Sequence, residues 1–235
     1  MKTIMLSIMV AALAGNAFAL DRYELDQRIR ALEGKFEAFQ ATSGKGIAAS
    51  TLKDAKGIVL LDRTKAGFVF AYQGGNGVAM VRDHSTGAWG PAAFIKANEA
   101  SLGVQAGGEQ NFYVILLMDD AAVRRLTESN FKFGGEARGT AGDASGGFAG
   151  DVNGRGDYVL VYVDRQGLFG GASLKGGSIA PNTDANRIYY DHFATMRDIL
   201  FGNKEQPSDA SRDLAATIDK YSVDKYSAAN SRPGS

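Results

Sequence analysis

The stretch TKAGFVFAYQGGNGVAMV, from Thr64 to Val81, decides the fold because it places two apolar runs around a Gly-Gly-Asn-Gly break. Such a glycine cluster either binds a phosphate group or turns the chain. A phosphate-binding loop requires a strand, the glycines and then a helix whose N-terminus faces the anion. Here a second strand-like run follows, without a Lys-Ser or Lys-Thr pair. We therefore predict that Gly74 to Gly77 form a β-hairpin turn, since Gly and Asn tolerate positive φ.

The chain from Gly57 onwards contains short apolar runs with a period of two residues, bounded by turn residues, which is typical of β-strands. These runs are GIVLLD, AGFVFAYQ, NGVAMVR, NFYVILLM, DYVLVYVDR and GLFGGASL. Between Gly134 and Gly177 glycines alternate with apolar residues, and glycine within strands marks bulges and tight curvature. The pattern predicts an α+β fold in which helices flank a strongly curved antiparallel sheet, and such curvature could close the sheet into a barrel.

Helical periodicity occurs at both ends of the chain. Residues 21–40 carry an apolar stripe at steps of three and four, from Leu25 to Phe39. This helix could lie on a membrane, but its charges are slightly acidic, which favours packing on the domain. Shorter helices are expected after Asp119, over 184–200 and after Ser208, whose side chain can cap a helix.

The first 19 residues have the pattern of a cleaved export signal. Lys2 precedes an apolar run, and Ala17-Phe18-Ala19 supplies the small residues that a signal peptidase recognises. The sequence thus predicts cleavage near Ala19 and a periplasmic or extracellular bacterial protein. The absence of cysteine excludes disulfides in this protein. We expect a signal peptide (1–19), an amphipathic helix (20–42), a β-rich domain (43–202) and a polar C-terminal tail with a short helix (203–235).

Catalytic and metal-binding patterns are sparse in this sequence. Its two histidines, His84 and His192, belong to no His-x-x-x-His or His-x-Glu motif, and no Gly-x-Ser-x-Gly elbow is present. We therefore predict no catalytic residue, no metal site and no cofactor. The formal net charge of zero also argues against nucleic-acid binding.

One local excess of positive charge stands out between Gly44 and Lys65. Five basic residues face two acidic ones there, and the basic residues are Lys45, Lys53, Lys56, Arg63 and Lys65. A cluster of this kind can meet anionic lipid headgroups, although a solvated surface is the simpler interpretation. These five residues are the candidate lipid-binding site.

Three separated blocks carry a resemblance to a known family. They are AKGIVLLDRTKAGFVFAYQGGNGVAMVR, then GAWGPAAFI with SLGVQAGGEQNFYVILLM, and then RQGLFGGASLKGGSI with Asp184-Ala185-Asn186 and Tyr189-Tyr190. In order and spacing, from about Ser43 to Tyr190, they resemble the SYLF-domain family, whose members bind lipids and in eukaryotes regulate actin assembly. Lys175 departs from the family pattern, which has an acidic residue at that position.

The resemblance implies a noncatalytic domain that binds anionic phospholipid headgroups, of the phosphoinositide type in the family, at an envelope membrane. It points to Lys56 of Ala-Lys-Gly and Lys65 of Lys-Ala-Gly-Phe as headgroup contacts. The alternative is a periplasmic structural or protein-interaction module without a lipid ligand. A buried stripe from Leu25 to Phe39 would favour that alternative. Because the signal predicts export, we expect that actin is not a partner.

Overall fold

The computed structural model describes residues 20–42, 46–66, 70–102, 108–129, 131–133, 148–151, 158–167 and 177–223. Its helices are α1 (Arg22–Ala41), α2 (Ala49–Asp54), α3 (Asp120–Arg124) with the 3₁₀ turn η1 (Arg125–Thr127), α4 (Thr183–Tyr190), α5 (Met196–Phe201) and α6 (Asp209–Ser222). Its strands are β1 (Gly57–Ala66), β2 (Phe70–Val81), β3 (Ala93–Leu102), β4 (Gly108–Leu117), β5 (Phe131–Phe133), β6 (Phe148–Asp151), β7 (Tyr158–Gly167) and β8 (Gly177–Pro181).

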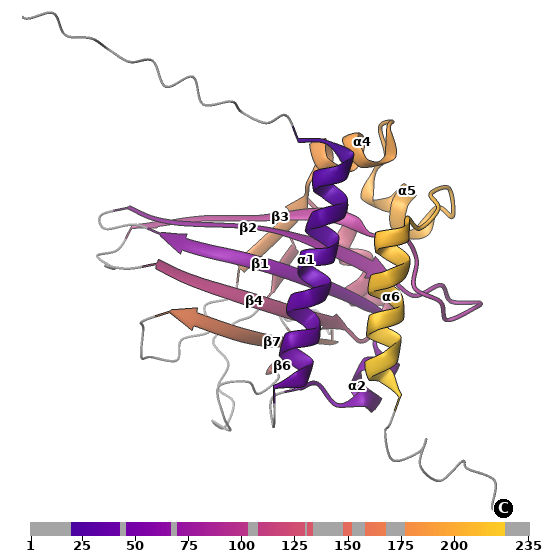
Figure 1. The fold of residues 1–235 in the computed structure, drawn as a ribbon, viewed down its shortest axis with the longest axis horizontal. Coiled ribbons are helices and arrows are strands. Elements are labelled where there is room, and N and C mark those ends of the chain that lie inside the picture. The colour runs from indigo at the N-terminus through magenta and orange to yellow at the C-terminus, as the bar shows by residue number, and fades with distance from the viewer. Residues whose placement is uncertain are drawn as a thin grey trace, which may run out of the picture.

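The strands form one antiparallel sheet in the order β5-β8-β3-β2-β1-β4-β7-β6, and Figure 1 shows the part from β3 to β6. The long strands β1 to β4 and β7 lie at its centre, and the short strands β5 and β6 lie at its two edges. The predicted α+β class with flanking helices is therefore confirmed. Within the described residues the sheet is open, so the curvature does not close it into a barrel.

The glycine cluster of the opening stretch lies inside a strand, and the predicted hairpin turn at Gly74 to Gly77 is wrong. Strand β2 runs through these residues, and Gly77 pairs with Leu61 of β1. A Cβ atom at Gly77 would lie 2.3 Å from the carbonyl oxygen of Leu60, and one at Gly75 would lie 2.6 Å from that of Asp62. The glycines thus permit a close approach of two strands. The run GLFGGASL lies mainly outside the described residues.

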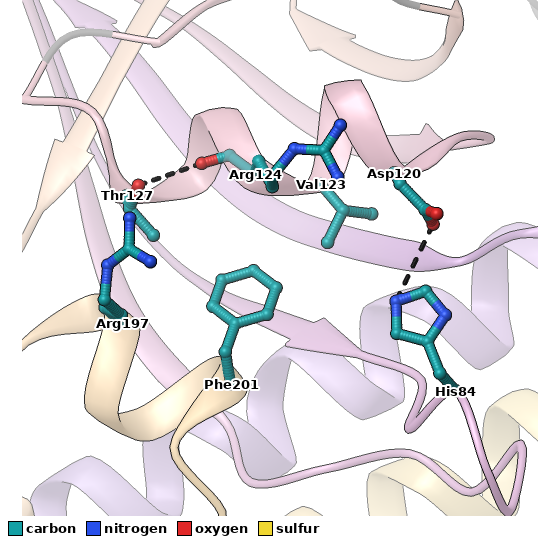
Figure 2. A pocket seen from close by; sticks show the side chains of 7 residues that line it. All are labelled: His84, Asp120, Val123, Arg124, Thr127, Arg197 and Phe201. Carbon is teal, nitrogen blue, oxygen red and sulfur yellow. Dashed lines mark hydrogen bonds and ion pairs between the residues drawn. The ribbon is translucent and has the colours of Figure 1, made fainter.

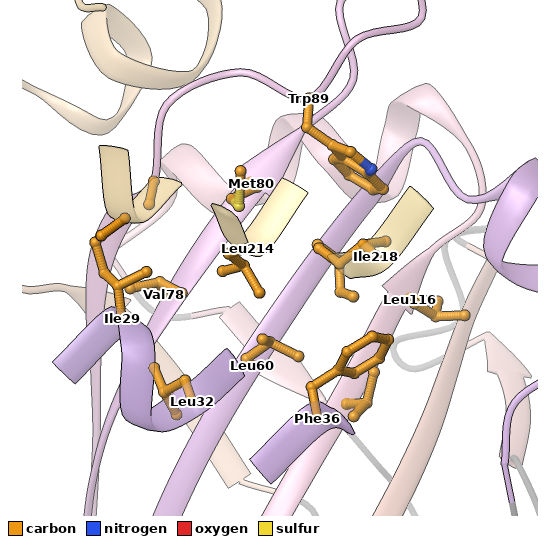
Figure 3. Close-up of a cluster of buried hydrophobic side chains, with 14 of the residues drawn as sticks. Ile29, Leu32, Phe36, Leu60, Val78, Met80, Trp89, Leu116, Leu214 and Ile218 are labelled. Atoms are coloured by element: carbon orange, nitrogen blue, oxygen red, sulfur yellow. The ribbon is translucent and has the colours of Figure 1, made fainter. Parts of the chain in front are cut away.

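Helices α1, α2, α4 and α6 cover one face of the sheet, which we call the helix-covered face. The predicted stripe of α1 is buried there, together with Leu214 and Ile218 of α6 and strand residues such as Leu60 and Val78 (Figure 3). Figure 1 shows α1 and α6 side by side across the strands. The burial shows that α1 packs on the domain. Among the described residues, none of the helices is long and apolar enough to span a bilayer.

Polar contacts fix α1 on this face. Arg30 pairs with Asp213 at 2.7 Å, Lys220 with Glu37 at 3.1 Å, and Lys35 with Asp62 of β1. The helix expected after Ser208 is present as α6, capped by the Ser208 side chain. Through Ala210, Leu214 and Ile218, α6 packs in the same core as α1 and the sheet.

The opposite face is covered by α3, η1 and α5, and we call it the second face. Val123 and Leu126 pack there with Met196 and Ile199 against strand residues such as Val59. The helix expected over 184–200 is wrong in one respect: it is broken into α4 and α5. Asp191 has a left-handed φ of 59°, and Thr195 starts α5 with a capping box. The break carries the chain from the helix-covered face to the second face.

Candidate anion-binding site

Three connections meet at one end of the sheet. The register pairs Gly57, the first residue of β1, with Val81 at the end of β2 and with Leu117 at the end of β4. Lys56 continues these ladders, because its N–H donates to Leu117 O at 2.9 Å and its carbonyl accepts from Arg82 N at 2.9 Å. Lys56, the β2–β3 loop and the start of α3 therefore lie together, and we call this region the pocket end of the sheet.

A cavity of about 220 Å³ opens at this end between α3 and α5. Figure 2 shows its lining, which combines apolar, cationic and other polar side chains. The lining residues are His84, Asp120, Val123, Arg124, Thr127, Arg197 and Phe201. Phe201 and Val123 form the apolar part, and the ring of Phe201 points into the space between the two helices (Figure 2). The mixture suits a small ligand with an anionic group and an apolar part.

Asp120 joins two basic side chains to the cavity wall. Its Oδ1 accepts a hydrogen bond from Lys56 Nζ at 3.0 Å and lies 3.7 Å from His84 Nε2. The hydrogen bond from Lys56 is the main cause that lowers the pKa of Asp120, and the charges of Lys56, His84 and Arg124 add to it. Asp120 is therefore ionised at neutral pH and neutralises Lys56.

The two arginines of the cavity lie on different helices but are both exposed. Arg124 lies on the exposed side of α3 and Arg197 on the first turn of α5, and both side chains are exposed. Among the described residues, neither has an ion-pair partner. The neighbouring Arg125 is buried, lies 5.5 Å from the ring centroid of Phe131 and faces Glu128 at 3.5 Å. Arg125 thus packs within the fold, while Arg124 and Arg197 are exposed at the cavity without a direct ion pair among the described residues, and the charge of Arg124 also acts on Asp120. Two exposed guanidinium groups favour an anion.

The structure disperses the predicted basic cluster. Lys53 is exposed at the end of α2, and Lys56 lies at the pocket end. Lys65 lies at the opposite end of β1, about 30 Å away for nine residues of extended strand, and its side chain is outside the described residues. Lys45 is also outside them. Within the part of the chain whose side chains are described, Lys53 and Lys56 are the exposed members of the predicted cluster.

Arg63 is a correction to the predicted site. Its side chain is 1% exposed on the second face, with its guanidinium 5.6 Å from the ring centroid of Tyr113. The period of two along β1 places Arg63 on the same face as Val59 and Leu61, which packing covers. A side chain buried in this way cannot meet a membrane surface, so Arg63 leaves the candidate site.

The sequence did not reveal His84, Arg124 and Arg197 as site residues. They lie on three separate segments without a shared motif, and only the sheet register and the packing of α5 bring them together. The Asp119-Asp120 pair before a short helix was visible, but it predicts helix capping as readily as a binding site. In the part of the chain that the structure describes, no group of three or more His, Cys, Asp or Glu side chains could hold a metal ion.

Comparison with known proteins places the chain among relatives. It is 32% identical to the SH3 domain-containing YSC84-like protein 1 of Homo sapiens over 184 residues, which cover 77% of this chain and 53% of that protein. It is also 32% identical to Protein YSC84 of Saccharomyces cerevisiae over 160 residues, 66% of this chain and 34% of that protein. The chain therefore spans about half the length of the human relative and about a third of the yeast one. No solved structure matches the chain significantly.

The family match covers more than half of the chain. The Ysc84 family, described as "Las17-binding protein actin regulator", matches residues 98–221. This range contains α3, α5 and α6, and hence most of the cavity lining. It also extends past residue 202, where the sequence had placed the end of the domain. The resemblance to the SYLF-domain family is thus confirmed, and the chain belongs to the Ysc84 (SYLF-domain) family.

Proposed function

We propose that this protein is a noncatalytic module that binds an anionic phospholipid headgroup at the surface of an envelope membrane after export. The observation that carries the proposal is the cavity at the pocket end. There Arg124 and Arg197 stand exposed without a direct ion pair among the described residues, and Asp120 of the lining holds Lys56 of the Ala-Lys-Gly motif. Each basic residue near an anionic membrane contributes about 1 kcal/mol to binding.

The mode of binding follows from the packing of α1. Because the stripe from Leu25 to Phe39 is buried against the sheet, α1 is not available for insertion without unfolding part of the core. The protein therefore binds the headgroup layer of the membrane through the cations of the pocket end. The apolar start of the sequence and Ala17-Phe18-Ala19 support export to the periplasm or beyond.

The alternative is a protein-interaction module without a lipid ligand. Two observations favour it: the buried stripe of α1, and the family description, which names Las17 binding and actin regulation. A relative from Saccharomyces cerevisiae is likewise named LAS seventeen-binding protein 3. The expectation that actin is not a partner rests on the export signal alone, and the names of the relatives give it no support.

Vesicle co-sedimentation tests the proposal. The purified protein is mixed with phosphatidylcholine vesicles, or with vesicles that also contain phosphatidylglycerol or a phosphoinositide, at low and high salt. We expect binding to the anionic vesicles only, and its loss at high salt, because screening weakens exposed charge pairs. The double variant Arg124→Glu with Arg197→Glu should lose this binding while its unfolding midpoint stays unchanged.

The matched control is the double variant Arg30→Glu with Arg212→Glu. It changes the net charge equally, on α1 and α6 of the helix-covered face. Equal loss of binding in both variants would mean that overall charge decides, and the cavity would be rejected as the site. If the wild type binds none of the vesicles, the protein-interaction module becomes the better interpretation.

A further inference from the structure

Phe193 is exposed in the turn that joins α4 to α5. Its side chain is 68% exposed, although a helix over 184–200 would have placed it on the same stripe as Tyr189 and Met196. Single exposed aromatic residues are common on protein surfaces, and exposure alone identifies no site. The informative feature is how the turn holds this residue.

Both sides of the turn are fixed by side-chain hydrogen bonds. On one side, His192 Nδ1 lies 2.7 Å from the carbonyl oxygen of Tyr190, and Nε2 lies 2.8 Å from Glu205 Oε1. On the other side, the Thr195 hydroxyl and the Asp198 carboxylate form the capping box of α5. Ala194, next to Phe193, is buried. The neighbours on both sides are anchored, so the turn is held in place while the Phe193 side chain is exposed.

The turn lies at the pocket end of the sheet. Its α4 side is tied to the start of β3, since the Tyr190 hydroxyl donates to the carbonyl oxygen of Ala92 at 2.7 Å. Its α5 side leads directly into the cavity wall, which contains Arg197 and Phe201. Phe193 is four residues from Arg197, so their Cα atoms are at most about 14 Å apart. The backbone of this exposed aromatic residue thus lies within that distance of the backbone of Arg197, a cation of the proposed site.

We propose that Phe193 is the apolar anchor of the membrane-docking surface and enters the interfacial layer of an anionic bilayer while Arg124 and Arg197 meet its headgroups. This inference rests on the proposed function and adds the orientation in which the protein docks: the pocket end faces the membrane. Aromatic side chains favour the boundary between headgroups and acyl chains, and neighbouring cations favour anionic lipid.

A bilayer suits this surface better than a protein partner. A stable protein interface buries about 800 Å² on each partner around an apolar centre. Here one side chain protrudes, and the nearby Asp198 is already neutralised by Lys204 at 2.9 Å. A single exposed aromatic residue near exposed arginines makes only a small contact. A lipid surface can be bound through a contact of this size.

The test compares the full-length mature wild type with Phe193→Ala and Phe193→Trp in partition to phosphatidylglycerol-containing vesicles. We expect about a tenfold loss of partition for Phe193→Ala, the effect of losing most of one aromatic side chain's burial. Phe193→Trp should retain binding, and its added fluorescence should shift to the blue and be quenched by brominated lipid. Tyr23→Ala is the matched control, because Tyr23 is 70% exposed on α1 of the helix-covered face.

The outcomes separate the anchor from the headgroup site. If wild type and Phe193→Ala bind equally and the added Trp stays in water, the anchor is refuted while the headgroup proposal stands. If Tyr23→Ala loses as much binding as Phe193→Ala, general surface hydrophobicity explains the loss and the anchor is again refuted. Absence of wild-type binding to any anionic vesicle would refute both proposals. Binding of Phe193→Ala to soluble inositol phosphate at wild-type affinity, together with weaker vesicle partition, would support the anchor.

Discussion

The helix-covered face and the pocket end differ in the burial of their apolar residues and in the pairing of their charges. On the helix-covered face, the apolar stripe of α1 is buried and charges such as Arg30 and Lys220 have carboxylate partners. At the pocket end, Phe193 is exposed and Arg124 and Arg197 have no anionic partner among the described residues. The first arrangement lowers the free energy of the folded state. The second leaves an apolar side chain and two guanidinium groups exposed to solvent. If the proposed function is right, stability and binding therefore belong to separate regions.

The largest effect on stability, without an effect on binding, is expected from Phe36→Ala on the helix-covered face. Phe36 is fully buried and meets Tyr221 edge-on, with ring centroids 6.0 Å apart. The cavity left by the substitution should lower the free energy of unfolding by about 3–5 kcal/mol. Urea unfolding measures this loss. The fraction that remains folded should bind anionic vesicles as the wild type does, and a specific loss of its affinity would show that the two regions are coupled.

Two glycine substitutions should change stability in opposite directions. Gly77→Ala should cost about 1–3 kcal/mol, because its Cβ would meet the backbone of β1, which cannot move aside. Gly34→Ala should stabilise by up to about 1 kcal/mol, since Gly34 lies within α1 and a Cβ there meets no atom within 4 Å. Thermal unfolding of both variants checks the pair. Equal effects would contradict the assignment of Gly77 to a close strand contact.

A smaller effect, on binding alone, is expected from Asp120→Asn. The substitution removes the carboxylate that neutralises Lys56 and leaves the cavity more positive. Partition to anionic vesicles at low salt should rise about fivefold, the effect of about 1 kcal/mol for one charge near the surface. Asp213→Asn makes the same charge change beside Arg30 on the other face and should leave partition unchanged. A fall in partition for Asp120→Asn would show that Asp120 organises the site instead of opposing the ligand.

The smallest effect concerns pH and the turn that holds Phe193. The hydrogen bond to Glu205, followed by that to the Tyr190 carbonyl, raises the pKa of His192, and Asp191 also favours the imidazolium form. Both partners are acceptors, so both ring nitrogens donate only when His192 is protonated. A raised pKa in the folded state means that this stabilisation is complete below the ordinary histidine pKa and is lost as the pH rises through the raised value.

The check is the stability of wild type and His192→Gln across that pH range. The difference between them should be present at pH 5.5 and should shrink towards pH 8.5, as measured by urea unfolding. A constant difference would show that the two contacts do not depend on the charge of His192.

Regular, local features of the fold were predictable from the sequence. The period of the apolar residues identified α1, β1, β4 and β7, and Ser208 identified the start of α6. Prediction failed where local preference and packing disagree. Gly74 to Gly77 have the composition of a turn, but β1 and β3 hold them in a strand. Residues 184–200 have helical spacing, but the chain must cross from one face to the other, and Asp191 breaks the helix.

The sequence by itself determined the α+β class, the stripe of α1, the absence of disulfides and the family, because these depend on residue type and short-range spacing. Only the tertiary structure decided which charges are available. Arg63 is as charged as Arg124 in the sequence, yet the pleat of β1 buries one and the surface of α3 exposes the other. The grouping of His84, Asp120 and Arg197 likewise depends on strand register and helix packing, which join residues more than 100 positions apart. Long-range contacts of this kind leave no periodic signal in a single sequence.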